Sequence, residues 1–488
     1  MASPVRVDRG AIRRALPACL AAVLCGCSLA PTYQTPTLQI PASFKGDDVW
    51  ASATPADASA RGDWWNVYQD PALGELEARV DAANPTLAVA LARYDQARAF
   101  ESQTRSGLLP HVAVSASPTN NRQSNLRPLR GSDQPNEYDA DTVGIVADYE
   151  LDLWGRVRNE VAEGKAEAQA AEADLASVEL SLEAQLADQY ISLRGFDVQA
   201  RILGDSIDAY TKALKLTQNR HAGGIASGLD VSRAQAQLSD AMAQAAEVAA
   251  QRALTEHAIA SLSGATATSF SLPAATTPIA LPSIPREVPC SLLQRRPDIA
   301  AAERRTFAAN AGIGVARAAL YPTISLSAAF GWQDTGHGTL LTAGNRYWAV
   351  GPLAALSVFD AGLRRARERE ARAVFDEASA RYRGVVLGAF QQVEDNLSLL
   401  DELGREARNE DDATAAAKQS QAIATNRYRE GAVNYLDVVT AQTAALQAER
   451  LAEQVRTRRL QASVDLIRAL GGGWSGTSNG TVAVVTSP

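Results

Sequence analysis

The sequence carries one structural plan twice within its 488 residues. Residues 426–438 repeat residues 219–231 at a constant offset of 207, with Asn, Arg, Gly, Leu, Asp and Val in the same places. A second set of matches has an offset of 212: residues 296–299 with 84–87, and residues 320–327 with 108–115. Self-similarity over half a chain indicates two copies of one supersecondary unit. Any fold for this chain must therefore contain two equivalent halves.

Each half is predicted to contain a helix, a strand, a loop, a second strand, a long helix, a turn and a final helix. Apolar residues spaced by three, four and seven predict helices, and apolar–polar alternation predicts strands. The predicted helices are residues 73–106, 155–220, 231–262, 362–428 and 438–470. The predicted strands are residues 111–117, 142–153, 323–332 and 347–359. Residues 118–139 are predicted to form a polar loop, and Gly195 and Gly204 are candidate breaks in the second helix.

The predicted domain boundaries follow this plan. They are a signal peptide at 1–26, a tether and equatorial segment at 27–72, a first repeat at 73–264, a linker at 265–295, a second repeat at 296–472 and a tail at 473–488. The linker holds five prolines between residues 273 and 289, which leaves no room for a helix. The offset between the repeats falls from 212 to 207, so the second repeat is slightly shorter than the first. The difference is most easily placed in the loop between the two strands of each repeat.

The first 26 residues are predicted to be a targeting signal. Four arginines within the first 14 residues precede the apolar residues 15–24, and a small-residue site follows. Leu24-Cys25-Gly26-Cys27 resembles a bacterial lipobox, in which Cys27 is lipidated after cleavage. An ordinary secretory peptide with incidental cysteines is the alternative.

Membrane crossing by a helix is not predicted, because no run of about 18 apolar residues follows the signal. Crossing would then depend on β-strands, or the chain would be held by lipid alone. Four strands cannot close a barrel, since small closed barrels need about eight. Three copies would supply about 12 strands and would also give the long helices partners, so a homotrimer is predicted.

No enzyme, cofactor or metal is predicted. The sequence contains no Ser/His/Asp or Cys/His pattern that supports a catalytic site, and its four histidines lack metal-ligand spacing. The formal net charge is −8, and the signal segment to be removed is basic, so the mature chain is more acidic still. That balance disfavours nucleic acid as a partner.

Four motifs in order carry a resemblance: the lipobox, Trp64-Trp65, Leu-Trp-Gly-Arg at 153–156 and Phe-Asp-Ala-Gly at 359–362. Together with the duplicated plan, they resemble the TolC-like outer-membrane efflux proteins, in the NodT/OprM-like lipoprotein branch associated with resistance-nodulation-division (RND) pumps. The similarity runs from about Cys27 to Gly472. It implies an α+β membrane protein: a trimeric 12-stranded β-barrel, four strands per chain, continued by a long α-helical periplasmic barrel.

The resemblance also implies a function. The chain would be lipid-anchored in the outer membrane, in contact with its lipid, and would extend into the periplasm. It would be the passive exit duct of a tripartite efflux system, for small molecules such as drugs. An inner-membrane RND transporter would deliver them through a periplasmic adaptor, the membrane fusion protein.

The two repeated turns are the predicted gate. Gly224 and Gly431 permit backbone angles that other residues resist, and a Leu-Asp pair starts each following helix. By resemblance, Leu436 and Asp437 narrow the periplasmic mouth, and Asp230 and Tyr428 tether neighbouring helices. The turn surfaces predicted to meet the adaptor are Gly224, Leu229, Gly431 and Val433. The alternative for both aspartates is helix capping or interaction with the helix dipole.

Two other functions stay open at this stage. One is protein export as the outer-membrane channel of a type I secretion system, against which the lipobox counts. The other is a lipid-anchored coiled-coil scaffold without a pore. A scaffold would show heptads without paired strand-loop-strand units, so the predicted strands argue against it.

Overall fold

The structure is a computed structural model that describes residues 28–38, 63–126, 135–282, 296–335 and 338–472. The predicted signal peptide and lipidation site, Cys27, lie outside the described residues, and lipidation stays a prediction. The chain divides into two compact units, each built from both repeats. The first takes residues up to Thr37, Tyr94–Ala171 and Ala302–Tyr382; the second takes Leu38–Arg93, Glu172–Ala301 and residues from Arg383 onward.

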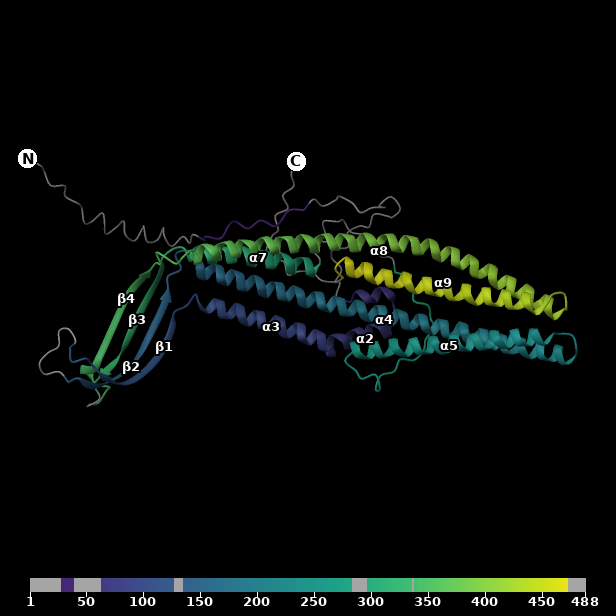
Figure 1. Cartoon of the computed structure of the whole chain (residues 1–488), viewed down its shortest axis with the longest axis horizontal. Helices are drawn as coiled ribbons and strands as arrows, with labels where there is room; N and C mark the ends of the chain where they lie inside the picture. The colour runs from purple at the N-terminus through teal and green to yellow at the C-terminus, as the bar shows by residue number, and fades with distance from the viewer. Residues whose placement is uncertain (1–27, 39–62, 127–134, 283–295, 336–337, 473–488) are drawn as a thin grey trace, which may run out of the picture. The chain divides into compact units, whose positions relative to one another are not determined.

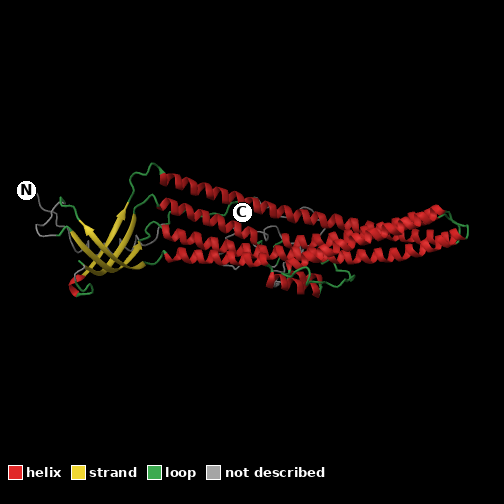
Figure 2. Cartoon of the chain, turned by 60° about the horizontal axis from the view of Figure 1, so that its bottom comes forward, coloured by secondary structure: helices red, strands yellow, loops and turns green. Residues whose placement is uncertain are grey.

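The first unit carries a four-stranded antiparallel sheet, shown in yellow in Figure 2. Its strands are β1 (His111–Arg122), β2 (Glu137–Glu150), β3 (Thr323–Asp334) and β4 (Arg346–Ala355), paired in that order. Gly144 of β2 lies opposite Gly331 of β3. A Cβ atom at Gly331 would lie 2.3 Å from the Val143 carbonyl oxygen, so the backbones approach here more closely than a side chain allows. Residues from both repeats thus form one sheet.

All four strands differ from their predicted ranges: β1 and β3 end later, and β2 and β4 begin and end earlier. The predicted loop at 118–139 was wrong at both ends, because β1 continues to Arg122 and β2 begins at Glu137. Pro118, the first residue of the predicted loop, lies inside β1 and is paired with Asp141 of β2. It is tolerated because β1 is the edge strand of this chain's sheet. At the other edge β4 ends at Ala355, and a turn with positive φ at Ala361 and Gly362 precedes the next helix.

The helix predicted at 73–106 was wrong as a single element. It is two helices, α2 (Pro71–Ala83) and α3 (Pro85–Ser106). Pro85 has no N–H to continue a hydrogen-bond ladder, and the Asn84 side chain caps the new helix instead. Its Oδ1 accepts the backbone N–H groups of Thr86 at 2.7 Å and Leu87 at 3.1 Å.

The remaining helices confirm the internal repeat in detail (Figure 1). Helices α4 (Arg156–Ala222) and α8 (Leu363–Arg429) each have 67 residues, and α5 (Gly228–Leu262) and α9 (Tyr435–Ala469) each have 35. Helices α3 and α7 (Pro297–Ala318) each have 22. The offset changes between the first strand of each pair and the following long helix, as expected. Gly195 and Gly204 lie within α4 and do not break it.

The hydrophobic core of the second unit gathers around the tryptophan pair. Trp64 and Trp65 belong to the short 3-10 helix η2 (Trp64–Tyr68), and both are buried. The Trp64 indole N–H donates to Glu183 of α4 at 2.8 Å, and the Tyr68 hydroxyl lies 2.7 Å from the Ser463 hydroxyl of α9. The segment before α2 is therefore anchored to helices of both repeats.

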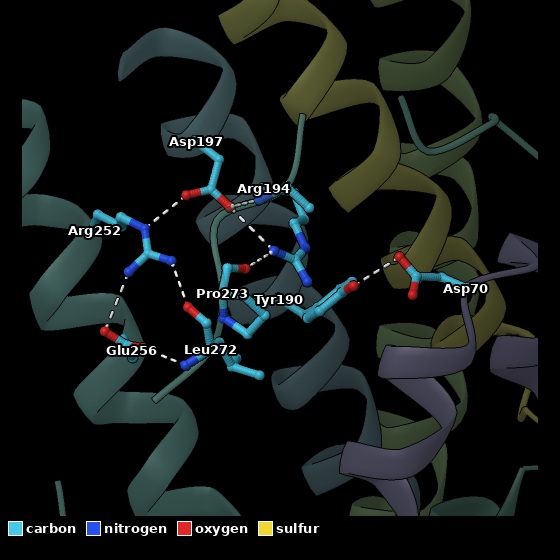
Figure 3. Close-up of polar contacts among 9 residues, drawn as sticks. Asp70, Tyr190, Arg194, Asp197, Arg252, Glu256, Leu272 and Pro273 are labelled. Carbon is cyan, nitrogen blue, oxygen red and sulfur yellow. Dashed lines mark hydrogen bonds and ion pairs between the residues drawn. The ribbon is translucent and has the colours of Figure 1, made fainter. Parts of the chain in front are cut away.

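The described part of the linker, residues 265–282, contains no helix or strand and is held by an ionic network (Figure 3). Asp197 of α4 is almost fully buried and lies between Arg194 and Arg252. The two arginines also donate to the carbonyl oxygens of Pro273 and Leu272, both at 2.8 Å. Two guanidinium groups pair with this buried carboxylate, which offsets part of the cost of burying it. The linker is fixed along α4 and α5 by these bonds.

A carboxylate in this unit should make stability depend on pH. Burial and the nearby Asp465 raise the pKa of Asp188 to about 7, and the nearby Arg468 partly offsets this rise. An unfolded aspartate has a pKa of about 3.9, so between about pH 4 and pH 7 the folded state holds a proton that the unfolded state has lost. Stability then falls as pH rises through that window. We expect Asp188→Asn to stabilise the protein by about 1–3 kcal/mol at pH 8 and hardly at pH 4.

Thermal unfolding of the detergent-solubilised protein at the two pH values measures this difference. Asp205→Asn is the matched control, since Asp205 lies on the same helix with its side chain 73% exposed. Equal pH dependence for the Asp188 variant and the wild type would contradict the assignment.

Candidate functional site

The two repeated turns adopt the same backbone conformation. Gly224 and Gly431 have φ of +72° and +79°, in the left-handed region that glycine enters without strain. In each turn one N–H bonds back five residues and the glycine N–H bonds back three. These bonds are Ile225 to Arg220 and Gly224 to His221, then Ala432 to Arg427 and Gly431 to Tyr428. This is the Schellman motif, which satisfies the last carbonyl groups of α4 and α8.

The helices after the turns begin differently. Ser227 caps α5, and Asp230 completes a capping box: each accepts the other's backbone N–H, at 3.2 and 3.1 Å. In the second copy Asn434 caps α9 by accepting the Asp437 N–H at 3.3 Å. The capping interpretation therefore holds for Asp230. Within the described residues the exposed Asp437 carboxylate accepts no hydrogen bond, so it is available for another role.

Tyr428 joins the two turns. Arg220, at the end of α4, donates to the Tyr428 carbonyl oxygen at 2.5 Å, and its guanidinium lies 4.6 Å from the centre of the Tyr428 ring. The ring packs edge-on against Tyr435 with centroids 5.3 Å apart, and both tyrosines are buried. Burial and the neighbouring Tyr428 raise the pKa of Tyr435 to about 12. We call Arg220, Tyr428 and Tyr435 the turn clamp.

The apolar side chains of the turns face solvent in this chain. Ile225 is 71% exposed, Leu229 58% and Leu436 43%, whereas Val433 is half-buried beside the clamp. Exposed large apolar side chains at the tips of two helical pairs indicate a contact surface. Of the residues predicted from sequence, the structure places Leu229, Leu436 and Asp437 on the surface and Tyr428 in the core.

Comparison with known proteins identifies the architecture. The family model described as "Outer membrane efflux protein" matches residues 76–265 and 288–472, once on each repeat. The chain belongs to this family. The efflux protein is 31% identical over 472 residues to the probable efflux pump outer membrane protein TtgC of Pseudomonas putida, covering 95% of this chain and 97% of TtgC. It is 31% identical to the outer membrane protein OprJ of Pseudomonas aeruginosa, over 93% and 95% of the two chains.

Solved structures agree. The efflux protein superposes on the outer-membrane channel OprN with a TM-score of 0.83 and 32% identity, covering 92% of this chain and all of OprN. These findings confirm the predicted resemblance, the fold and the outer-membrane location. Across the described helices none is both long and apolar enough to cross a membrane.

Sequence reasoning named Tyr428 in the efflux protein but missed its partner, Arg220. A signal was present, because Arg220 and Arg427 are in register in the two copies. Only the fold shows that they differ: Arg220 lies over the Tyr428 ring, whereas Arg427 is exposed. The first copy has His221 at the position of the tyrosine. His221 instead bonds within its own turn, 2.8 Å from the Ala226 carbonyl oxygen.

Proposed function

We propose that the protein is the outer-membrane channel of a tripartite efflux system. Small molecules such as drugs would reach it from an inner-membrane RND pump through a periplasmic adaptor, and would leave by passive flow. The pair of equivalent helical turns with exposed leucines, in a chain of this family, carries the proposal. A duct of this kind needs no catalytic residue, and its specificity would lie mainly in the pump.

The sheet supports assembly into a trimer. In this chain β1 and β4 each have one edge without a partner among the described strands. Open edges of long strands are unstable unless they are paired or covered. Pairing β4 of one copy with β1 of the next would close 12 strands around a threefold axis and leave no edge.

The gate is proposed at the second turn. Under threefold symmetry, Asp437 would form a ring of three carboxylates, and such a ring favours cations. Leu436 beside it would narrow the mouth. Tyr428 and Asp230 would hold the neighbouring helices. The turn surfaces at the exposed Leu229 and the half-buried Val433 would meet the adaptor. Opening would follow when the helical pairs splay about the turns at Gly224 and Gly431.

Planar-bilayer conductance tests the gate. We expect the double variant Leu436→Ala with Asp437→Ala to raise the conductance of the resting trimer several-fold, because both the apolar constriction and the acidic ring are removed. Leu229→Ala is the matched control, since Leu229 holds the equivalent place in the first copy and is also exposed. Conductance equal to the wild type in the double variant would exclude these residues as the gate.

A further inference from the structure

Helices α2 and α4 present four carboxylates to one another, away from the turns. Glu77 and Asp81 are four residues apart on α2, and Glu179 and Glu183 are four residues apart on α4. Residues with this spacing share one face of a helix. One oxygen from each of Asp81, Glu179 and Glu183 can be chosen so that all three lie within 4.8 Å of one another. We call these four residues the α2–α4 acidic cluster.

No positive side chain of the described residues balances the charge of the cluster. Among the described residues, none of the four carboxylates forms an ion pair. Among the described residues, the Trp64 indole N–H is the one group that donates a hydrogen bond to these carboxylates. It donates to Glu183 at 2.8 Å. Asp63, the residue before Trp64, adds a further negative charge that acts on both Asp81 and Glu183. Like charges at this spacing repel strongly unless a cation or protons intervene.

Glu77 is the independent indication of a ligand. Its side chain is 0% exposed, and within the described residues neither carboxylate oxygen has a hydrogen-bond partner. Glu77 shares one face of α2 with Asp81, and the charges of Glu183 and Asp81 act on it, so its carboxyl group lies beside the cluster. An unpaired buried carboxylate costs several kcal/mol. A cation among the other three would supply the missing compensation.

We propose that Asp81, Glu179 and Glu183 bind a hard divalent cation of the Ca²⁺ class. The cation would join α2 to α4, with the buried Glu77 carboxyl group behind it. Ca²⁺ takes six to eight oxygen ligands at about 2.3–2.6 Å, so ligands on opposite sides lie up to about 5 Å apart. The cluster offers carboxylate oxygen without His or Cys, which selects against softer metals.

The site is accessible to an ion. Asp81 and Glu179 are solvent-exposed, whereas Glu183 is buried. A groove of about 350 Å³ lies beside them, lined by Asp81, Glu179, Asn84 and apolar residues of α2, α3 and α4. The exposed side can supply water ligands and an entry path, and the buried side can supply the charge that holds the ion.

Trp64 provides a direct test. An ion bound to Glu183 would lie within a few ångströms of the indole, so Tb³⁺, a Ca²⁺ surrogate, should luminesce when tryptophan is excited. The experiment uses the full-length protein in detergent after chelation of bound metal. We expect Ca²⁺ to displace the emission. In the double variant Glu179→Gln with Glu183→Gln, we expect Tb³⁺ binding at least about tenfold weaker, because two charged ligands become neutral.

The control is Glu172→Gln with Glu247→Gln, which removes two exposed carboxylates of the same unit outside the cluster. It should bind Tb³⁺ as the wild type does. Equal emission in all three proteins would overturn the proposal, as would absence of emission from the wild type.

Protonation is the alternative to ion binding, because burial raises the pKa of Glu77 to about 10. A stability measurement separates the two. If the cluster binds Ca²⁺, millimolar Ca²⁺ raises the melting temperature of the wild type and leaves the Glu179/Glu183 variant unchanged. If protons alone neutralise it, Ca²⁺ shifts neither protein, and the proposal fails. Channel conductance is unaffected by that outcome, so the proposed function is tested separately.

Discussion

Replacing Arg220 with alanine is expected to loosen the resting state of the channel. The side chain makes a charge-assisted hydrogen bond to the Tyr428 carbonyl oxygen and a cation–π contact with its ring. A hydrogen bond to a charged group contributes about 1.5–3 kcal/mol to stability. A cation–π contact contributes about 0.5–2 kcal/mol. Both link α4 to α8 at the turns, where the proposed opening motion must separate the helical pairs. A factor of ten in population corresponds to about 1.4 kcal/mol, so we expect at least about a tenfold rise in open probability.

Single-channel recording in planar bilayers measures the open probability directly. Arg427→Ala is a closely matched control, because Arg427 occupies the same place in the second repeat but is exposed. It should behave as the wild type. If both arginine variants opened the channel equally, net charge at the mouth would be responsible and the turn clamp would not.

Replacing Gly264 with alanine is expected to cause a large loss of stability. Gly264 follows α5 with φ of +70°, a conformation that costs alanine about 1 kcal/mol. The new Cβ would lie 2.5 Å from the Ala83 carbonyl oxygen and 2.9 Å from its Cβ. The end of α2 cannot move aside freely, because Asn84 donates to the Leu262 carbonyl oxygen at 2.8 Å. Together these effects should cost about 3 kcal/mol or more.

Thermal unfolding of the solubilised protein gives the comparison. Gly204→Ala is the control, since a Cβ there meets no atom within 4 Å and the residue lies inside α4. Alanine is the better helix former, so that variant should gain about 0.5–1 kcal/mol. A Gly264 variant as stable as the wild type would show that the junction of α2, α3 and α5 is not rigid.

Local sequence patterns predicted the glycines of the two turns, but the prediction was wrong at the break between α2 and α3 and at Pro118. The glycines of the two turns were correctly assigned because a left-handed backbone has few alternatives to glycine. The break between α2 and α3 also had a local signal, an asparagine followed by proline, but the apolar spacing across it favoured one helix. Pro118 was misjudged for a different reason: whether proline is tolerated depends on whether its strand lies at a sheet edge, which is a property of the whole sheet.

The sequence by itself determined the duplicated order of elements, the equal helices and the two turns, because each follows from periodicity and from the backbone preferences of nearby residues. The tertiary structure alone decided which of the two repeated arginines is used, since both follow an asparagine at the same place in the repeat and only packing brings Arg220 onto the Tyr428 ring. It also brought together Glu77 and Glu183, which are about a hundred residues apart in the chain. Contacts of that kind depend on how helices pack, and no local pattern records them.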